Sequence, residues 1–237
     1  MDNARPIRFH SPMCSRYNLT SPPDVVRAFF GLATIEAFPP RYNIAPGQPV
    51  AIVRHGRNGA EMRLVRWGLV PSWVKDPRKL SALINARFET AAEKPAFRGA
   101  LRHRRCLVPA DGFYEWSGSR GRRVPWLLKP RRAGPIALAG LWEHWLGADG
   151  SEVETMAILT IPANPTVAPI HDRMPAVLPR EHFESWLDCR SGSSVEAVRL
   201  IGSVPADLLE AVEIGPEIGD VRREGPDLVR PARPRLL

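Results

Sequence analysis

The 25 prolines of this 237-residue chain recur along its whole length, and they limit what it can fold into. Because proline interrupts the interiors of helices and strands, this spacing predicts many loops between short elements and marks no single linker. Apolar and β-branched runs predict strands at 50–54, 62–67, 136–141 and 156–161. Short helices are predicted at 24–30, 180–187 and 194–201, while 81–101 is typical of helix and connector.

Strands and helices alternate irregularly and show no internal repeat, which favours the α+β class. We predict one compact domain over about 14–215, with a mixed, mainly antiparallel sheet or barrel-like core and flanking helices. With 44% hydrophobic residues, the chain is long enough to bury one substantial core. Residues 216–237 are rich in Pro, Gly and charge, so a disordered tail is predicted there.

A formal net charge of +8 indicates either an anionic partner such as nucleic acid or a solvated basic surface. The basic residues gather in two clusters, Arg98, Arg102, Arg104 and Arg105, then Arg120, Arg122, Arg123, Lys129, Arg131 and Arg132 around a flexible hairpin tip. Such clusters bind phosphates through counterion release. The tryptophans near them could stack on unpaired bases or simply belong to the core; they are Trp67, Trp73, Trp116 and Trp126. The combination suggests single-stranded nucleic acid.

The three cysteines, Cys14, Cys106 and Cys189, are odd in number and far apart in sequence. This argues against a disulfide framework and against a CxxC-type metal site. The first twelve residues hold no apolar core of the signal-peptide type, and no stretch approaches the length of a membrane-spanning helix. We therefore expect an intracellular, soluble protein with no membrane association, metal or cofactor.

Cys14 directly follows a second methionine, Met13, and could therefore become the first residue of the protein. If translation starts at Met13, aminopeptidase trimming would leave a terminal cysteine with a free α-amine beside its thiol. These groups titrate near ~8 and ~8.5, so each has a nucleophilic form near neutral pH. Together they can condense with an aldehyde, the amine forming an imine and the thiol closing a thiazolidine ring. The alternative is an internal cysteine that serves as a small buried hydrophobe.

Three further segments carry side chains suited to chemistry. In LINARFET, Asn85 can hold an amine or carbonyl and Arg87 suits a phosphate, although both could lie on a solvated helix surface. In CLVPADGFYEW, aromatic neighbours would raise the pKa of Glu115 and make it a proton shuttle, unless it points outward from a strand. In NPTVAPIHDRMP, His171 suits acid–base work on an amine or thiol. Its neighbour Asp172 carries little weight as an orienting partner, because adjacent side chains diverge.

Seven blocks of the sequence, in this order, resemble the SRAP family, named for SOS-response-associated peptidases and now understood as abasic-site processing proteins. The blocks are MCSRYN, RYNIAPGQ, RWGLVPSW, INARFET, RCLVPADGFYEW, ALAGLWEHW and LTIPANPTVAPIHDRMPAVL. They extend from Met13 to about Leu187 with plausible spacing, so the match is far more specific than any single motif.

The resemblance implies that Cys14 crosslinks to a ring-opened abasic deoxyribose in single-stranded DNA. Asn85 would position the amine or the sugar, and Glu115 would move protons during ring opening and imine formation. His171 would assist imine chemistry and help reverse the crosslink. DNA contacts would come from Arg16 and Arg87 on phosphates, from Trp67, Trp73 and Pro46 as wedge and stacking surface, and from Thr160 near the site.

By the same resemblance, the protein would act in the DNA damage response, with a peptidase or hydrolase classification and lyase activity as a further option. We expect a cytoplasmic monomer that associates with the nucleoid when bound to DNA. Two other classes stay open. One is a thiol peptidase that uses Cys14 with His171 as base, and the other is a noncatalytic module that binds single-stranded DNA.

The sequence departs from the family pattern in two places. Ser15 replaces the glycine of the usual Met-Cys-Gly-Arg start, so the backbone there must avoid conformations reserved for glycine. Twelve residues precede Met13, and with them attached Cys14 has an amide in place of its amine. Residues 1–13 are therefore expected to be absent or removed in the active protein. A true start at Met13 is favoured over proteolysis, because Met13 alone restores the required terminus.

Overall fold

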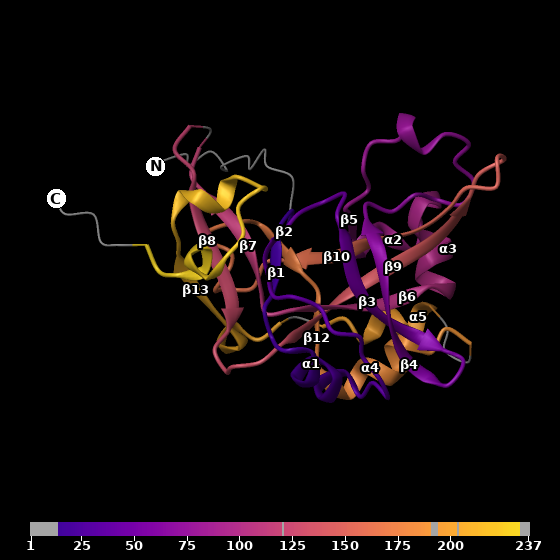
Figure 1. Ribbon diagram of the computed structural model, residues 1–237, viewed down its shortest axis with the longest axis horizontal. Helices are drawn as coiled ribbons and strands as arrows, with labels where there is room; N and C mark the ends of the chain where they lie inside the picture. Colours follow the sequence, from indigo (N-terminus) through magenta and orange to yellow (C-terminus); the bar gives the residue numbers. More distant parts are fainter. Residues whose placement is uncertain (1–13, 120, 191–193, 203, 233–237) are drawn as a thin grey trace, which may run out of the picture.

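Five strands close into a barrel at the centre of the main hydrophobic core (Figure 1). The computed structural model describes residues 14–119, 121–190, 194–202 and 204–232. In ring order the strands are β3 (Pro49–Gly56), β4 (Gly59–Trp67), β10 (Glu152–Pro162), β9 (Ile136–Leu146) and β6 (Arg105–Ala110), which pairs back with β3. Within this ring β4 and β10 are parallel and the other pairs are antiparallel. Every residue of β6 is buried, so both faces of the barrel wall are covered there.

Three short strands extend the wall at β9 and β10. They are β5 (Asn85–Arg87) and β11 (Arg173–Pro175), which pair with β10, and β12 (Val177–Leu178), which pairs with β9. Strand β4 pairs with β10 as far as Met156, and from Ile158 onward β5 takes the place of β4 beside β10. This strand corrects the sequence prediction of helix and connector across 81–101. The rest of that segment is helical as predicted, in α2 (Phe88–Ala91) and α3 (Pro95–His103).

A second, fully antiparallel sheet lies beside the barrel, on the left in Figure 1. Its order is β13 (Leu209–Glu213), β8 (Val124–Pro130), β7 (Gly112–Ser117), β1 (Tyr17–Leu19) and β2 (Arg41–Ile44). The chain passes from the barrel strand β6 to β7 through Asp111. The Asp111 carboxylate accepts hydrogen bonds from the backbone nitrogens of Thr20 and Ser21, which fixes the chain just after β1. The predicted hairpin with a basic tip is confirmed as β7 and β8.

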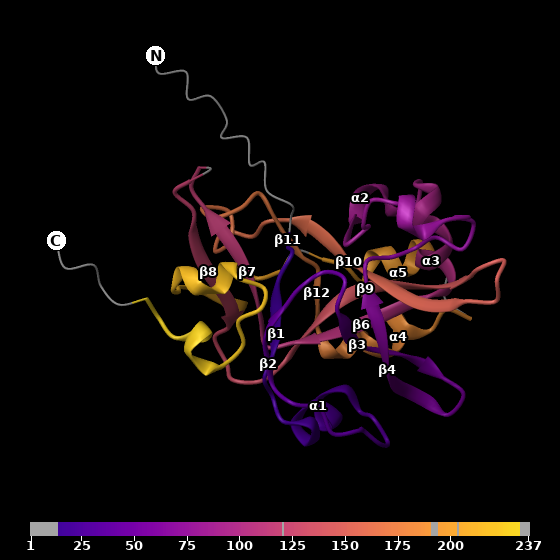
Figure 2. The same cartoon turned by 45° about the horizontal axis from the view of Figure 1, so that its top comes forward.

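Short helices cover the barrel from outside (Figure 2). Besides α2 and α3 they include α1 (Pro23–Phe30), α4 (Phe183–Leu187), α5 (Ser194–Arg199) and the 3-10 turns η1 (Pro77–Lys79), η2 (Arg180–His182) and η3 (Ala206–Leu208). Helices α1 and α4 meet through stacked rings of Phe30 and Phe183, whose centroids are 5.4 Å apart. Gly31, at a φ of 65°, ends α1 in a left-handed conformation that suits glycine. None of the helices in the described ranges is long and apolar enough to cross a membrane.

The α+β prediction, with a mixed, mainly antiparallel and barrel-like core, is confirmed. The prediction of a disordered tail from residue 216 is corrected over 216–232. This segment forms two 3-10 turns, η4 (Pro216–Gly219) and η5 (Pro226–Val229), and it buries Ile218 and Leu228 in a small second core. The remainder of the predicted tail, 233–237, and the predicted amino-terminal extension, 1–13, lie outside the described residues.

Candidate active site around Cys14

Cys14 lies just before β1 and is almost fully buried, with 2% of its surface exposed. Its backbone nitrogen donates a hydrogen bond of 2.7 Å to Oε1 of Glu115. Its φ of 37° makes it the only non-glycine residue with a positive φ among those described. A non-glycine residue held in this region costs of order 1–3 kcal/mol, and such strain clusters at functional sites.

Glu115 is the carboxylate at the centre of this arrangement. It lies in β7, is only 2% exposed, and accepts the hydrogen bond from the backbone nitrogen of Cys14. Burial raises the pKa of Glu115 to about 7, while hydrogen bonds from Cys14 act in the opposite direction. The sequence left open whether Glu115 faces inward or outward, and the structure places it inward. Its carboxyl can therefore be neutral or charged near neutral pH, as a proton shuttle requires.

The thiol of Cys14 shares this environment. Burial is the main cause that raises the pKa of the thiol, and the charge of Glu115 and a hydrogen bond to it add to the effect. The thiol is therefore held in its protonated form at neutral pH. A protonated thiol can still close a ring on an adjacent imine, provided that a nearby group manages the proton.

Asn85 completes the cluster from the barrel side. It is the first residue of β5, where pairing with β10 fixes it opposite Ile158. Its Nδ2 donates to the backbone oxygen of Cys14 at 3.3 Å. The structure therefore brings Cys14, Asn85 and Glu115 together from β5 of the barrel and from β1 and β7 of the second sheet.

His171 is buried at the end of the loop between β10 and β11. Its Nδ1 accepts a hydrogen bond of 3.0 Å from the backbone nitrogen of Arg173, so the neutral ring carries its proton on Nε2. The same Nδ1 is 3.1 Å from Oδ1 of Asp172, a contact that the sequence reasoning had given little weight. Burial is the largest cause that lowers the pKa of His171, and Asp172 opposes it. The charge of Asp172 also raises the pKa of Glu115, which places this segment within electrostatic range of Glu115.

Arg173 and Glu89 were missed as site residues by the sequence reasoning, although both lie in the blocks that carry the resemblance. The guanidinium of Arg173 donates to both carboxylate oxygens of Glu89 and to the backbone oxygen of Thr160 at 2.6 Å. Arg173 therefore joins α2, β10 and the His171 loop. The signal that could have found it is its place two residues after His171 in HDRMP.

Three of the predicted DNA contacts lie where a strand of DNA could reach them. Arg87 is exposed at the end of β5, and Pro46 is half-buried in the turn between β2 and β3. Trp73 exposes 63% of its surface, which makes it the large aromatic residue best placed to stack on a base.

Trp67 and Thr160 differ from their predicted roles because both are fully buried. The indole nitrogen of Trp67 donates to the backbone oxygen of Ile84 at 2.9 Å, and its ring meets the ring of Tyr17 edge-on. No face of Trp67 is available for stacking in this structure. Thr160 lies in β10, and its hydroxyl points to the backbone oxygen of Ala86 at 3.5 Å. Thr160 is therefore a core contact between β5 and β10.

Arg16, which was predicted as a phosphate ligand, is half-buried and has partners within the protein. Its Nη1 donates to Oδ1 of Asn43 at 2.7 Å and to the backbone oxygen of Ile218 at 2.8 Å. Its Nη2 donates to the backbone oxygen of Gly219 at 3.3 Å. The guanidinium is thus committed to partners within the protein.

The first basic cluster is only partly a surface. Arg98 and Arg102 are exposed on α3, and Arg104 pairs with Glu143 at 3.2 Å. Arg105 is buried, and its guanidinium donates to the backbone oxygens of Trp186, Leu101 and Asp188. Arg105 therefore ties the ends of α3 and α4 together and is not available to DNA. In the second cluster Arg120 lies outside the described residues.

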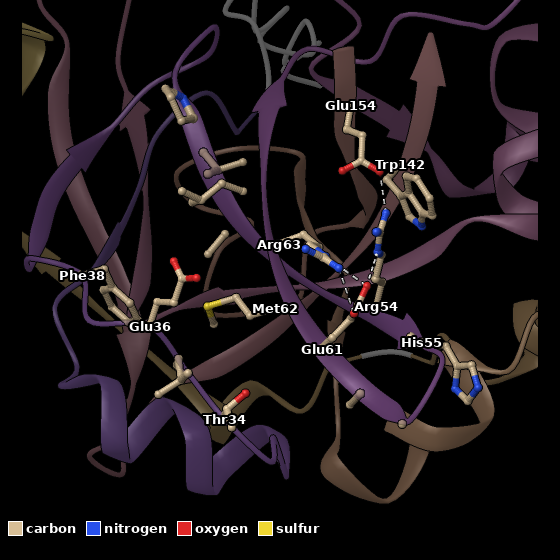
Figure 3. A pocket seen from close by; sticks show the side chains of 18 of the residues that line it. Thr34, Glu36, Phe38, Arg54, His55, Glu61, Met62, Arg63, Trp142 and Glu154 are labelled. Carbon is tan, nitrogen blue, oxygen red and sulfur yellow. Dashed lines mark hydrogen bonds and ion pairs between the residues drawn. The ribbon is translucent and has the colours of Figure 1, made fainter. Parts of the chain in front are cut away.

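A cavity of about 1500 Å³ lies elsewhere, between the segment 33–38 and the hairpin of β3 and β4 (Figure 3). Arg54 is its most connected residue, paired with Glu61 at 2.9 Å and Glu154 at 2.6 Å and packed over the ring of Trp142. None of the four predicted catalytic residues lines this cavity. The candidate catalytic residues therefore lie where the two sheets meet and not in this cavity.

Comparison with known proteins gives one family. The family model described as SOS response associated peptidase (SRAP) matches residues 13–221. Among curated proteins, the abasic site processing protein YoqW of Bacillus subtilis is 33% identical over 221 residues, covering 92% of this chain and 99% of that protein. YedK of Escherichia coli, named in the same way, is 31% identical over 192 residues and covers 81% and 84% of the two chains.

A relative from rat, the abasic site processing protein HMCES, is 33% identical over 232 residues, covering 81% of this chain and 65% of that protein. Among solved structures, a protein from Bacteroides thetaiotaomicron superposes with a TM-score of 0.81 at 26% identity. That match covers 93% of this chain and 100% of the other. The fold described above is therefore shared with this protein of Bacteroides thetaiotaomicron.

Proposed function

The chain belongs to the SOS response associated peptidase family, and from this membership we propose that it crosslinks covalently to abasic sites in single-stranded DNA through Cys14. Its curated relatives are named abasic site processing proteins, which supports the lesion as substrate. The single observation that carries the proposal is the 2.7 Å hydrogen bond between the nitrogen of Cys14 and Glu115. It joins the nitrogen that would attack the sugar to a carboxyl that can exchange protons with it.

The proposed reaction needs both nucleophiles of a terminal cysteine. An abasic deoxyribose opens to an aldehyde, and the α-amine of Cys14 adds to its carbon. Loss of one water gives an imine, and the thiol sulfur then adds to the same carbon. The thiol proton is balanced by protonation of the ring nitrogen, so the net products are a thiazolidine and one water. No oxidant or reductant is required.

Glu115 is suited to the proton transfers in this sequence. Burial raises its pKa to about 7 in the chain with residues 1–13 attached. The ammonium of a terminal Cys14 would lower that pKa, so the Glu115 carboxylate would be charged and could accept a proton from the ammonium and return it to the departing hydroxyl. Asn85, which already donates to the backbone oxygen of Cys14, would hold the terminus in place during attack. We assign His171 to the imine steps and to reversal, with its Nε2–H as the proton donor.

The backbone at Cys14 offers independent support for a terminal cysteine. A φ angle exists only when a residue precedes, so the left-handed φ of 37° describes the chain with residue 13 attached. When Cys14 is the first residue, that torsion and its cost of order 1–3 kcal/mol disappear. The nitrogen also becomes an amine, which is the group that the chemistry needs. We therefore propose that the active protein begins at Cys14.

The same geometry argues against a thiol peptidase as the main function. A peptidase nucleophile needs a lowered thiol pKa, usually supplied by a partner such as a histidine. Here the pKa of the Cys14 thiol is raised, and its hydrogen-bond partner is the carboxylate of Glu115. This environment suits an amine-led condensation better than a thiolate attack.

The proposal is tested with two forms of the protein, one beginning at Cys14 and one retaining residues 1–13. Each is incubated with single-stranded DNA containing one abasic site, or with intact DNA, and separated on a denaturing gel. We expect a shifted band only for the form that begins at Cys14 on abasic DNA. Cys14→Ala should abolish it, and Cys106→Ala serves as the matched cysteine control. Equal crosslinking by the form that retains residues 1–13 would overturn the proposal.

A further inference from the structure

The carboxy-terminal residues 214–232, here called the strap, run across the outer face of the second sheet (Figures 1 and 2, yellow). Its two ends are pinned to each other by a bridge between Ile214 and Pro231 and by a hydrogen bond of 2.8 Å from Ala232 to Glu213. Between these ends, η4 and the residues just after it present backbone oxygens to the sheet, and η4 and η5 each bury one apolar side chain, Ile218 and Leu228. The strap is therefore a closed loop fastened at its base.

The strap reaches β1 through Arg16, two residues after Cys14. The guanidinium makes two contacts with the strap: Nη1 donates to the backbone oxygen of Ile218 and Nη2 to that of Gly219, while Nη1 also donates to Oδ1 of Asn43 in β2. Burial is the main cause that lowers the pKa of Arg16. Such burial of a charged group is stable only when its donors find acceptors, and the strap carbonyls supply two of them.

The strap reaches β2 through Asn43, which is fully buried. Its Nδ2 donates to the backbone oxygens of Asp220 at 2.9 Å and Arg223 at 3.1 Å. The backbone nitrogen of Tyr42 donates to Oε2 of Glu224 at 2.7 Å. Both strands that follow the reactive cysteine in the sequence are therefore held by the same nine-residue part of the strap, 216–224.

The strap also backs β7, the strand that carries Glu115. Neighbouring residues on a strand point to opposite faces, so Tyr114 and Glu115 lie on opposite sides of β7. Tyr114 packs in the second core with Ile218 and Leu228, and its hydroxyl donates to the backbone oxygen of Tyr42 at 2.6 Å. The site faces one side of this sheet, and the strap covers the other.

We propose that the strap positions the Cys14 terminus against Glu115, with Arg16 as the positioning residue, and this rests on the function proposed above. In the crosslinking form nothing precedes Cys14, so its amine is held only by the chain that follows and by its own contacts. Arg16 is the first long side chain after it that is anchored within the protein. A nucleophile displaced by about 1 Å from its attack geometry loses on the order of 100-fold in rate. Arg16 on this view acts through Cys14 and does not grip a phosphate.

The test compares three variants of the protein that begins at Cys14: Arg16→Gln, Glu224→Ala and, as control, Arg87→Gln. Crosslinking rates are measured on abasic single-stranded DNA, and equilibrium binding is measured on the same DNA with a nonreactive tetrahydrofuran lesion. We expect Arg16→Gln and Glu224→Ala to slow crosslinking ~10- to 100-fold while the salt dependence of binding stays at the wild-type value. Arg87→Gln should lower the salt slope by ~0.7, as loss of one phosphate contact predicts.

The charge change in Glu224→Ala distinguishes a positioning role of the strap from a direct role in DNA binding. Glu224→Ala removes a negative charge, which would favour DNA binding, yet it should slow the crosslink. The proposal fails if Arg16→Gln lowers the salt slope as Arg87→Gln does, or if both strap variants keep the wild-type rate. Arg16→Lys covers the case in which Arg16→Gln does not fold, because lysine keeps the charge and one carbonyl contact. An intermediate rate is expected for Arg16→Lys, and a wild-type rate would also overturn the proposal.

Amide hydrogen exchange, measured without DNA, tests the positioning role of the strap independently of the crosslinking function. Amides of Tyr17–Leu19 should exchange faster in Arg16→Gln and Glu224→Ala than in wild type, while amides of β9 and β10 should not change. If wild-type protein forms no crosslink, the proposed function fails, and the exchange pattern still decides whether the strap orders β1. Unchanged exchange in Tyr17–Leu19 would refute the strap as a positioning element.

Discussion

The backbone nitrogen of Cys14 lies 2.7 Å from Oε1 of Glu115, although the two residues are 101 positions apart in the sequence. The contact is made because β1 and β7 pair side by side, with Tyr17 opposite Phe113. With residues 1–13 attached, the donor is a neutral amide. With Cys14 as first residue, it is an amine or ammonium beside a carboxylate. A chain that begins at Cys14 therefore differs at this site in its electrostatics as well as in its chemistry.

The first prediction concerns maturation. Protein isolated from its native cells should have an intact mass that begins at Cys14, because only this form has the amine and is free of the left-handed φ. Mass spectrometry of the intact protein and of its first peptide measures this directly. Crosslink-competent protein that still begins at Met1 would contradict it.

The second prediction concerns stability against pH in the form that retains residues 1–13. The folded-state pKa of Glu115, about 7, lies above its ordinary value of 4.5, so folding favours the neutral carboxyl. The stability it contributes is fully present below pH ~4.5 and is lost as pH rises through 7. Between pH 4.5 and 8, wild type should lose up to about 3 kcal/mol relative to Glu115→Gln. Urea unfolding at both pH values measures this difference.

The comparison with the processed form is the control for that experiment. When Cys14 is the first residue, its ammonium can pair with the Glu115 carboxylate and offset the burial of charge. The pH-dependent gap between wild type and Glu115→Gln should therefore shrink. A gap of the same size in both forms would show that the terminal amine does not contact Glu115.

The third prediction separates Glu115 from His171. We expect Glu115→Gln and His171→Ala each to slow crosslinking by roughly tenfold to a thousandfold, in or somewhat below the usual range for general acid–base groups. Both residues are buried, so affinity for single-stranded DNA should not change. Reversal should suffer more in His171→Ala, because its Nε2–H is assigned to the return of a proton. Timed crosslinking and release into a competitor trap measure the two steps, and wild-type rates in both variants would refute the assignment.

The fourth prediction uses two tryptophans in different environments. Trp73→Ala should weaken binding of single-stranded DNA by ~1–3 kcal/mol, because an exposed indole can stack on one base. Trp67→Phe should leave binding unchanged and lower stability, because it loses the hydrogen bond to Ile84 and leaves part of the core unfilled. Fluorescence titration and thermal unfolding report these separately. Equal binding losses in both variants would mean that Trp67 reaches DNA after all.

The sequence predicted the elements whose signal is local. Apolar runs marked parts of β3, β4, β9 and β10, and a segment after two prolines marked α1. It did not predict β5, because Asn85–Arg87 becomes a strand only through the edge that β10 offers. Nor did it predict order in the strap, whose Pro, Gly and charged residues are fixed by buried Ile218 and Leu228 and by carbonyls paired with distant side chains.

In the candidate site, too, some features could be predicted from the sequence and others depended on the tertiary structure. Residue type and resemblance selected Cys14, Asn85 and Glu115, and the structure places these three in contact. Burial could not be judged from single residues, so Trp67 and Thr160 were assigned to DNA although both are core residues. Arg16 was assigned to a phosphate from the family resemblance alone. Its two backbone acceptors, Ile218 and Gly219, lie about 200 residues away in the sequence, beyond the reach of local patterns.

The strap also bears on how the protein is made. During translation the strap is synthesised roughly 200 residues after Cys14. At ordinary rates of synthesis this corresponds to a delay of ~10–40 s. During that interval Arg16 and Asn43 have none of the acceptors that Ile218, Gly219 and Asp220 later provide. With the strap as positioning element, a nascent chain carries its aldehyde-reactive group in an unassembled site. On the proposed role of the strap, the crosslinking rate reaches its full value only after residues 216–224 have been synthesised, so a nascent chain reacts more slowly than the finished one.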